Sequence, residues 1–182
     1  PKAEASVRFA GLCQSRCHGD GSWSRLFPEI DGSPSPLQQL AYDIPVEAEP
    51  TLFIVEDLTG SGKTEASLVM AHRLMKNALA GGVFIGLPTM ATSNGMFERL
   101  ATTYRNLFAE TAEPSISLAH GSRRLSEAFK EVALKAPGSV TECYGSNEHT
   151  ASASCSQWIA QENRRSLIAD VGVGTIDQAL MS

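Results

Sequence analysis

A run of glycines followed by lysine and threonine is the segment of this chain best suited to chemistry. Glycines let the backbone wrap closely around an anion, and a helix start presents N–H groups with a favourable dipole. In such a phosphate-binding loop the lysine reaches the β- and γ-phosphates and the next hydroxyl ligates Mg²⁺. We predict a nucleotide site with Lys63 and Thr64 as catalytic residues and Thr64 as metal ligand. Its predicted residues are Thr59, Gly60, Ser61, Gly62, Lys63, Thr64 and Glu65.

One residue of this loop departs from the usual pattern. The form G-x4-G-K-[ST] places a small residue at its first position, where this chain has Asp57. A carboxylate at that position could repel phosphate, or it could point away from the loop. Because the loop amides and Lys63 are still present, we expect nucleotide binding, weakened at most.

A glutamine about 25 residues before Lys63 is a candidate for base recognition. The side chain of Gln38 offers a paired donor and acceptor, which suits adenine. Most glutamines are solvated surface residues, so the residue alone is equally compatible with no binding role.

Small polar residues also occupy two other junctions between a predicted strand and a predicted helix. Pro88 and Thr89 precede a helix that contains Asn94, and Gly174 and Thr175 precede the last helix. Such groups at a helix start suit the phosphodiester backbone of a nucleic acid. The same residues also serve as ordinary helix caps, and the sequence leaves both interpretations open.

Apolar runs alternate with helical patterns in the way an α/β fold requires. We expect a mostly parallel sheet with helices on both faces and ligand sites at the carboxyl ends of the strands. The predicted strands are 51–56, 83–87, 116–119 and 166–171. The predicted helices are 37–44, 63–80, 91–110, 123–135, 154–163 and a last one from Thr175.

The chain divides into two predicted regions. Residues 1–35 form a linker or docked arm, with Trp23, Leu26 and Phe27 as its apolar anchors, and residues 36–182 form one domain. Residues 136–155 are rich in Gly, Ser and Thr and are expected to form a long loop.

The composition is that of an ordinary globular protein. Its 182 residues are 42% hydrophobic, and the net charge of −5 argues against a generally basic nucleic-acid wrapper. No apolar run approaches the roughly 20 residues of a membrane helix, so no membrane partner is expected. Because the chain does not begin with Met, we expect a piece of a longer protein.

The cysteines are too sparse to predict a disulfide framework. Cys13, Cys17 and His18 could hold zinc, but a second pair is needed, and Cys143 and Cys155 lie far along the chain. We interpret the cysteines as reduced thiols and expect a cytoplasmic protein.

Several stretches together resemble the helicase of the CRISPR-associated helicase–nuclease of type I systems, and PSPLQ and CSQWI look closest to its subtype I-E branch. The resemblance covers residues 34–182, and its LPTMAT and GVGTIDQ segments are more specific than the phosphate loop. The matching segments are PSPLQ, TLFIVEDLTGSGKTEASL, GGVFIGLPTMATSNGMFERL, SLAHGSRR, CSQWI and VGVGTIDQAL.

This resemblance implies the first RecA-like P-loop NTPase domain of a superfamily 2 helicase. It implies ATP-driven 3′-to-5′ movement on single-stranded DNA, with the Cascade surveillance complex, an HD nuclease domain and a second RecA-like domain as partners. Gln38 would bind adenine, and the loop would hold the phosphates and Mg²⁺. Pro88, Thr89, Asn94, Gly174 and Thr175 would contact DNA.

Two departures from the family pattern shape these expectations. The family has Ala-Pro where Asp57 and Leu58 stand, and no D-E-x-H motif follows the last predicted strand. We therefore expect this piece to bind nucleotide without useful hydrolysis. The alternatives are another superfamily 2 helicase of DNA or RNA and a non-catalytic docking module.

Overall fold

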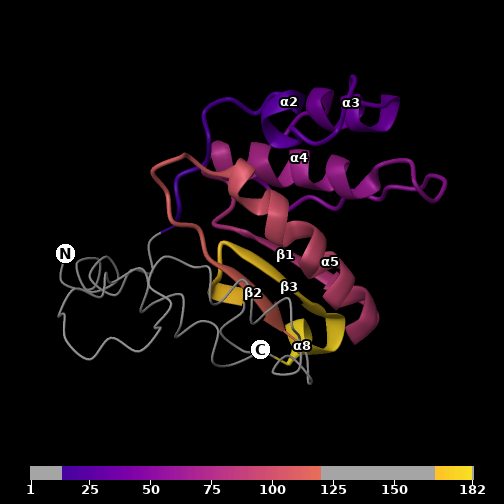
Figure 1. Ribbon diagram of the computed structural model, residues 1–182, viewed down its shortest axis with the longest axis vertical. Helices are drawn as coiled ribbons and strands as arrows, with labels where there is room; N and C mark the ends of the chain where they lie inside the picture. Colours follow the sequence, from indigo (N-terminus) through magenta and orange to yellow (C-terminus); the bar gives the residue numbers. More distant parts are fainter. Residues whose placement is uncertain (1–13, 120–166, 182) are drawn as a thin grey trace. The chain divides into compact units, whose positions relative to one another are not determined.

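The computed structural model describes residues 14–119 and 167–181, and these residues belong to two compact units (Figure 1). The first unit comprises Pro1–Ser15, Gly82–Tyr104 and Glu113–Ser182, and the second comprises Arg16–Gly81 and Arg105–Ala112. The predicted helices 123–135 and 154–163 and the predicted loop 136–155 lie outside the described residues. The same is true of Cys13, Cys143 and Cys155.

The first unit is built on a parallel three-stranded sheet. Its strands are β1 (Val83–Leu87), β2 (Ile116–Ala119) and β3 (Val171–Thr175), in the order β1-β3-β2. The long helix α5 (Met90–Thr103) runs alongside the sheet and contacts all three strands (Figure 1). The predictions of an α/β fold and of strands at 83–87 and 116–119 are confirmed.

The position predicted for the last strand was wrong. The sequence suggested a strand over 166–171 and a turn at Gly174, but β3 runs from Val171 to Thr175 and all five of its residues are buried. A Cβ on Gly174 would collide with the carbonyl oxygen of Ala119 on β2. The glycine therefore marks a close approach of two backbones inside the sheet, rather than a turn.

The buried apolar side chains of this unit come from the strands, from one face of α5, and from positions just after α5 and just before β3: Phe97, Leu100, Tyr104, Leu118, Ala119, Ala169, Val171 and Val173. The last described helix, α8 (Ile176–Leu180), begins directly after β3 with Thr175 at the predicted N-cap position. The Thr175 side chain makes no capping hydrogen bond, and it is buried.

A buried carboxylate ties three segments of this unit together. Asp170 precedes β3, and its Oδ1 accepts a hydrogen bond from the Ser15 amide at 2.9 Å. Its Oδ2 accepts from the Ser115 amide and hydroxyl, both at 2.9 Å, and from the Ser15 hydroxyl at 3.1 Å. Only 9% of Asp170 is exposed, so these bonds replace most of its contact with water.

The second unit contains three helices: α2 (Trp23–Leu26), α3 (Pro36–Asp43) and α4 (Lys63–Lys76), of which α3 and α4 pack together. The helix predicted over 63–80 ends at Lys76 because Ala78 takes a positive φ of 56°, which cannot continue a right-handed helix. The buried apolar side chains of this unit are Trp23, Leu26, Phe27, Ala41, Ala66, Leu68, Val69, Met75, Leu107 and Phe108.

The strand predicted before the phosphate loop is not formed. Residues 51–58 have no assigned secondary structure, and Leu52 and Ile54 are 84% and 78% exposed. Their apolar composition fits a strand that is buried on both faces. A strand is stable only when its backbone groups pair with a neighbour, and this segment pairs with none in the described part of the chain.

The helix predicted over 91–110 ends at Thr103 and is followed by the 3₁₀ helix η1 (Tyr104–Leu107). The backbone beyond η1 bonds to the arm instead of continuing the helix. Phe108 forms an isolated bridge with Cys17, and the Ala109 amide donates to the Arg16 carbonyl at 2.9 Å.

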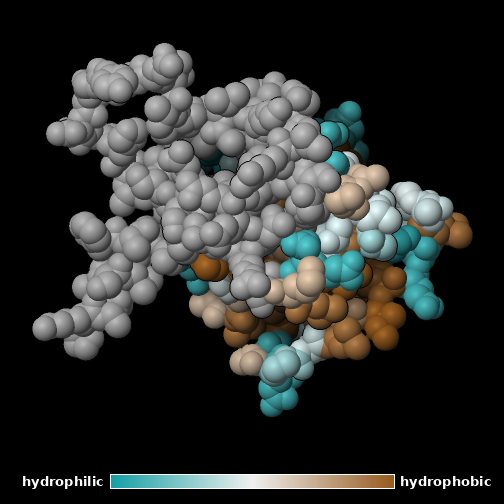
Figure 2. Space-filling view, turned by 90° about the horizontal axis from the view of Figure 1, so that it is seen from below, coloured by the Kyte–Doolittle hydropathy of each residue, from teal (hydrophilic) through white to brown (hydrophobic). Residues whose placement is uncertain are grey.

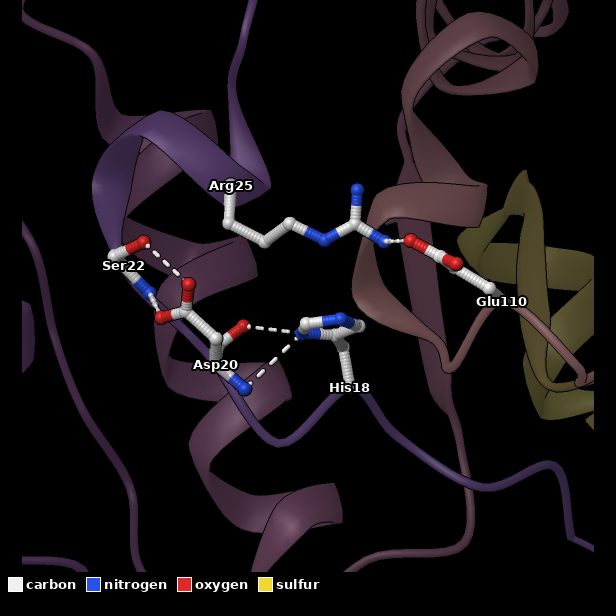
Figure 3. Close-up of polar contacts among 5 residues, drawn as sticks. All are labelled: His18, Asp20, Ser22, Arg25 and Glu110. Atoms are coloured by element: carbon white, nitrogen blue, oxygen red, sulfur yellow. Dashed lines mark hydrogen bonds and ion pairs between the residues drawn. The ribbon is translucent and has the colours of Figure 1, made fainter.

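The arm around α2 is docked through the predicted anchors, since Trp23, Leu26 and Phe27 are all buried. The rings of Trp23 and Phe27 lie 4.7 Å apart. Ahead of α2, Asp20 accepts hydrogen bonds from the Ser22 amide (2.9 Å) and hydroxyl (3.1 Å), and these bonds lower the pKa of its carboxyl (Figure 3). Whether residues 1–35 and 36–182 act as separate regions stays a prediction.

No helix in 14–119 or 167–181 is both long and apolar enough to cross a membrane. Within the same residues, no cluster of three or more His, Cys, Asp or Glu side chains could hold a metal ion.

A buried histidine links the arm to α4. His72 is only 1% exposed, and its Nε2 donates a hydrogen bond to the carbonyl oxygen of His18 at 3.1 Å. Burial lowers the pKa of His72 below its ordinary value of 6.5, because the charged ring loses more hydration than the neutral ring.

This shift predicts a loss of stability in acid. As the pH falls through 6.5, the unfolded chain binds a proton at His72 before the folded chain does, so the free energy of unfolding decreases. Chemical denaturation at pH values from 8 to 5 measures the effect, with His72→Gln as a variant that has no proton to bind there. Parallel pH profiles for the two proteins would contradict this role of His72.

Candidate functional site

The predicted phosphate loop forms a tight turn that leads directly into α4. Gly60 and Gly62 have φ angles of 85° and 87°, a left-handed conformation that favours glycine. Gly62 is the N-cap of α4, and Lys63 is its first residue. The glycine spacing therefore has a local structural reason, and it places the first-turn amides of α4 at the end of the loop.

The side chain of Lys63 folds back over the loop. Its Nζ donates hydrogen bonds to the carbonyl oxygens of Asp57 at 2.7 Å and Leu58 at 2.6 Å. The Leu58 carbonyl also accepts from the Ser61 amide at 3.3 Å. The structure therefore brings Asp57, Leu58, Ser61 and Lys63 together in one small closed loop.

Two further side chains at the loop suit an anionic ligand. Ser61 Oγ is buried and has no hydrogen-bond partner among the described residues, so it leaves a donor available for a phosphate oxygen. Glu65, in the first turn of α4, is 6% exposed, and an acid there is favourable to the helix dipole. Thr64 also lies in this turn, one residue after Lys63. The residues present fit a nucleotide phosphate and its Mg²⁺.

Gln38 lies against this loop, although it comes from a different helix. Its Nε2 donates to the Gly62 carbonyl at 3.4 Å, and its Oε1 accepts from the Ser35 amide at 2.8 Å. Ser35 completes a capping box with Gln38 at the start of α3, and its hydroxyl donates to the Ser61 carbonyl at 3.4 Å. Sequence analysis missed Ser35, although the spacing S-x-x-Q is the signature of such a box.

The second predicted group of site residues lies at the carboxyl edge of the sheet in the first unit. The register pairs Leu87 with Thr175, so Pro88 and Thr89 follow one strand end beside the end of its neighbour. Pro88 and Thr89 are exposed, Asn94 is half-buried, and Gly174 and Thr175 are buried. The structure thus brings the two predicted junctions to one edge, but it exposes only the first of them.

The hydroxyl of Thr89 is engaged in a helix cap. Its Oγ1 accepts from the Thr92 amide at 3.2 Å, and the Thr92 hydroxyl accepts from the Thr89 amide at 3.3 Å. The Ser93 hydroxyl donates to the Thr89 carbonyl at 2.9 Å. The cap therefore occupies the Thr89 hydroxyl and, within the first turn of α5, the Thr92 amide.

Apolar side chains are exposed near the same edge, at the start of α5 and along α8. Figure 2 views the molecule from the side on which α8 lies in Figure 1, and it shows hydrophobic residues gathered on this face. The exposed apolar residues of these elements and of the position after α8 are Met90, Ile176, Leu180 and Met181.

Comparison with family models gives no match to this chain. Curated proteins do match. The chain is 37% identical over 149 residues to the CRISPR-associated endonuclease/helicase Cas3 of Escherichia coli, covering 82% of this chain. It is 34% identical over 164 residues to the Cas3 of Thermus thermophilus and 34% identical over 143 residues to that of Streptococcus thermophilus. The chain spans 15–17% of the length of these relatives.

Solved structures of Cas3 also match this chain. The crystal structure of T. fusca Cas3 matches 99% of this chain with a TM-score of 0.68 and 29% identity, and the chain covers 18% of it. The structure titled T. fusca Cas3-ADP matches with a TM-score of 0.66 at 28% identity, and the one titled Cas3-ATP with 0.60 at 25%. The RecA-like α/β fold implied by the sequence is confirmed, and the chain belongs to the Cas3 family of CRISPR-associated endonuclease/helicases.

Proposed function

We propose that this chain binds ATP as the nucleotide-holding part of an ATP-dependent DNA helicase and translocase in CRISPR antiviral defence. The observation that carries the proposal is the loop of Gly60, Gly62 and Lys63 at the start of α4, in a chain that belongs to the Cas3 family. Relatives titled as ATP and ADP complexes support the choice of nucleotide.

Each residue of the loop has a role in this proposal. Lys63 would neutralise the β- and γ-phosphates, and the hydroxyl of Thr64 would ligate Mg²⁺, which would supply charge neutralisation for phosphoryl transfer. The amides of Thr59, Gly60 and Gly62 surround the phosphates together with Ser61, and Glu65 supports the first turn of α4. Gln38, already bonded to the loop at Gly62, binds adenine.

The proposed DNA contacts lie at the carboxyl edge of the sheet. Pro88, Thr89 and Asn94, with Gly174 and Thr175 beside them, contact the backbone of single-stranded DNA, along which the protein moves in the 3′-to-5′ direction. The other first-turn amides of α5 are the donors for a backbone phosphate, because the Thr89 hydroxyl and the Thr92 amide are engaged in the cap.

Further partners belong to the same proposal. The protein acts in the cytoplasm with the Cascade complex, an HD nuclease domain and a second RecA-like domain. The support is the family, since the matched residues make up only 15–17% of these relatives.

Hydrolysis is expected to need more than this chain. Phosphoryl transfer requires a group that orients water and cations that stabilise the transition state, in addition to the lysine and Mg²⁺. We expect the purified chain to bind ATP but to release no phosphate above background, with or without single-stranded DNA, in a phosphate-release assay. ATP turnover by the purified chain that disappears in the Lys63→Ala variant would contradict the expectation that hydrolysis needs more than this chain.

A non-catalytic docking module is the second candidate. The hydrogen bonds from Lys63 to Asp57 and Leu58 favour it, because they occupy the ammonium group on which phosphate binding depends. A folded chain that binds no ATP at millimolar concentration with Mg²⁺ would establish this alternative.

A further inference from the structure

The carboxylate of Asp57 is hydrogen-bonded at the start of the phosphate loop. Its Oδ1 accepts a hydrogen bond from the Leu58 amide at 2.7 Å. The carbonyl of the same residue accepts from Lys63 Nζ at 2.7 Å. The acid is thus fixed at the first position of the loop, and its own carbonyl is one of the two that Lys63 contacts.

The side chain and the backbone of Asp57 therefore both engage hydrogen-bond donors of the loop. The carboxylate occupies an amide of the loop, and the carbonyl helps to hold the ammonium group of Lys63. A phosphate that enters needs the lysine, since backbone amides and the lysine are what a phosphate loop offers. Its entry must separate Lys63 from two carbonyl oxygens and must bring negative charge to a loop that already carries the Asp57 carboxylate at its start.

The loop is accessible to a ligand, so these contacts are not enforced by burial. Asp57 is exposed, and Leu58 is 80% exposed. In an exposed loop, hydrogen bonds of this kind compete directly with water and ligand, and a fixed negative charge acts through a high dielectric. The expected effect is a moderate weakening of affinity and not a complete block.

We propose that Asp57 sets the nucleotide affinity of this loop, as an internal anion that competes with the phosphates of ATP. The inference rests on the proposed function, because it concerns the same site. It predicts that the penalty grows with the phosphate charge of the ligand, from AMP to ADP to ATP, and is absent for adenosine.

Two variants separate the charge of Asp57 from its hydrogen bond. Asp57→Ala removes both, and Asp57→Asn keeps an oxygen acceptor for the Leu58 amide without the charge. Glu56→Ala is the matched control, since it removes an equal charge from the exposed neighbouring residue. Isothermal titration of the full chain with adenosine, AMP, ADP and ATP in the presence of Mg²⁺ measures each affinity.

Asp57→Ala is expected to bind ATP about tenfold more tightly than the original chain, which corresponds to about 1.4 kcal/mol. Asp57→Asn should recover most of this gain, and Glu56→Ala should change the affinity less than about threefold, as expected for a screened surface charge.

Three outcomes would overturn the inference. The first is an Asp57→Ala chain that binds ATP no more tightly than the original chain, in which case the proposed function stands and only Asp57 loses its role. The second is an equal gain for adenosine, which would mean that the effect does not depend on phosphate. The third is an absence of binding by every variant, which removes the proposed function and the inference together.

Discussion

Replacing Lys63 by alanine is expected to weaken ATP binding by about 100-fold or more, because a charge-assisted contact to phosphate is lost. The loop contributes this lysine at the start of α4, and its Nζ bonds to two carbonyl oxygens of the closed loop. The alanine variant loses the charge and also the bonds to the Asp57 and Leu58 carbonyls. Titration with ATP and Mg²⁺ measures the loss.

Lys76→Ala is the matched control for this experiment. Lys76 is an exposed lysine in the last turn of the same helix, so its loss removes one positive charge without touching the loop. The control is expected to bind ATP as the original chain does, and circular dichroism shows whether both variants keep their helix content. An affinity of Lys63→Ala within about threefold of the original chain would contradict the assigned role, since such a difference is below about 1 kcal/mol.

Replacing Asp170 by alanine is expected to destabilise the first unit by about 3 kcal/mol. The variant leaves the amides of Ser15 and Ser115 without their acceptor, and a hydrogen bond to a charged group contributes about 1.5–3 kcal/mol when its partner is left buried. These bonds join Ser15, in the arm, to Ser115 and Asp170, which directly precede β2 and β3. Chemical denaturation gives the free energy of unfolding.

Glu98→Ala is the control for this second prediction. Glu98 lies exposed on α5 in the same unit, so its removal deletes one carboxylate without breaking a buried contact. We expect a change within about 0.5 kcal/mol, as for most surface substitutions. Equal stabilities for Asp170→Ala and Glu98→Ala would show that the bonds to Asp170 contribute nothing to folding.

The strands that could be predicted from sequence are those whose apolar runs lie in the sheet. Residues 83–87 and 116–119 satisfy this condition and were predicted at their observed bounds. β3 was misplaced because glycine usually indicates a turn, whereas Gly174 is needed where its backbone meets that of β2. A local pattern cannot reveal a contact that depends on the neighbouring strand.

For residues 51–56, the sequence predicted a strand that the structure does not form. Their pattern matches a buried strand, but strand formation requires a partner, which no local pattern guarantees. The segment stays outside the sheet, next to a loop that nevertheless has the expected glycine geometry. Local chemistry, such as the φ angles of Gly60 and Gly62, is therefore more predictable than pairing over distance.

The candidate site could be predicted in its residue types but not in its contacts. The motif identified Lys63 and Thr64, and Gln38 was a candidate for base recognition that the family resemblance supported. The sequence could not show that Lys63 bonds to two loop carbonyls, or that the Asp57 carboxylate accepts from the Leu58 amide. These contacts depend on side-chain orientation, which a motif leaves open, and they are the basis for expecting a reduced affinity.

The most direct test of the account is an equilibrium titration of the purified chain with ATP and Mg²⁺. The account predicts saturable binding to one site per chain, with a dissociation constant of roughly 1 mM or below, that is, at least about 4 kcal/mol of binding free energy. A folded chain that shows no saturable binding at millimolar ATP would contradict it.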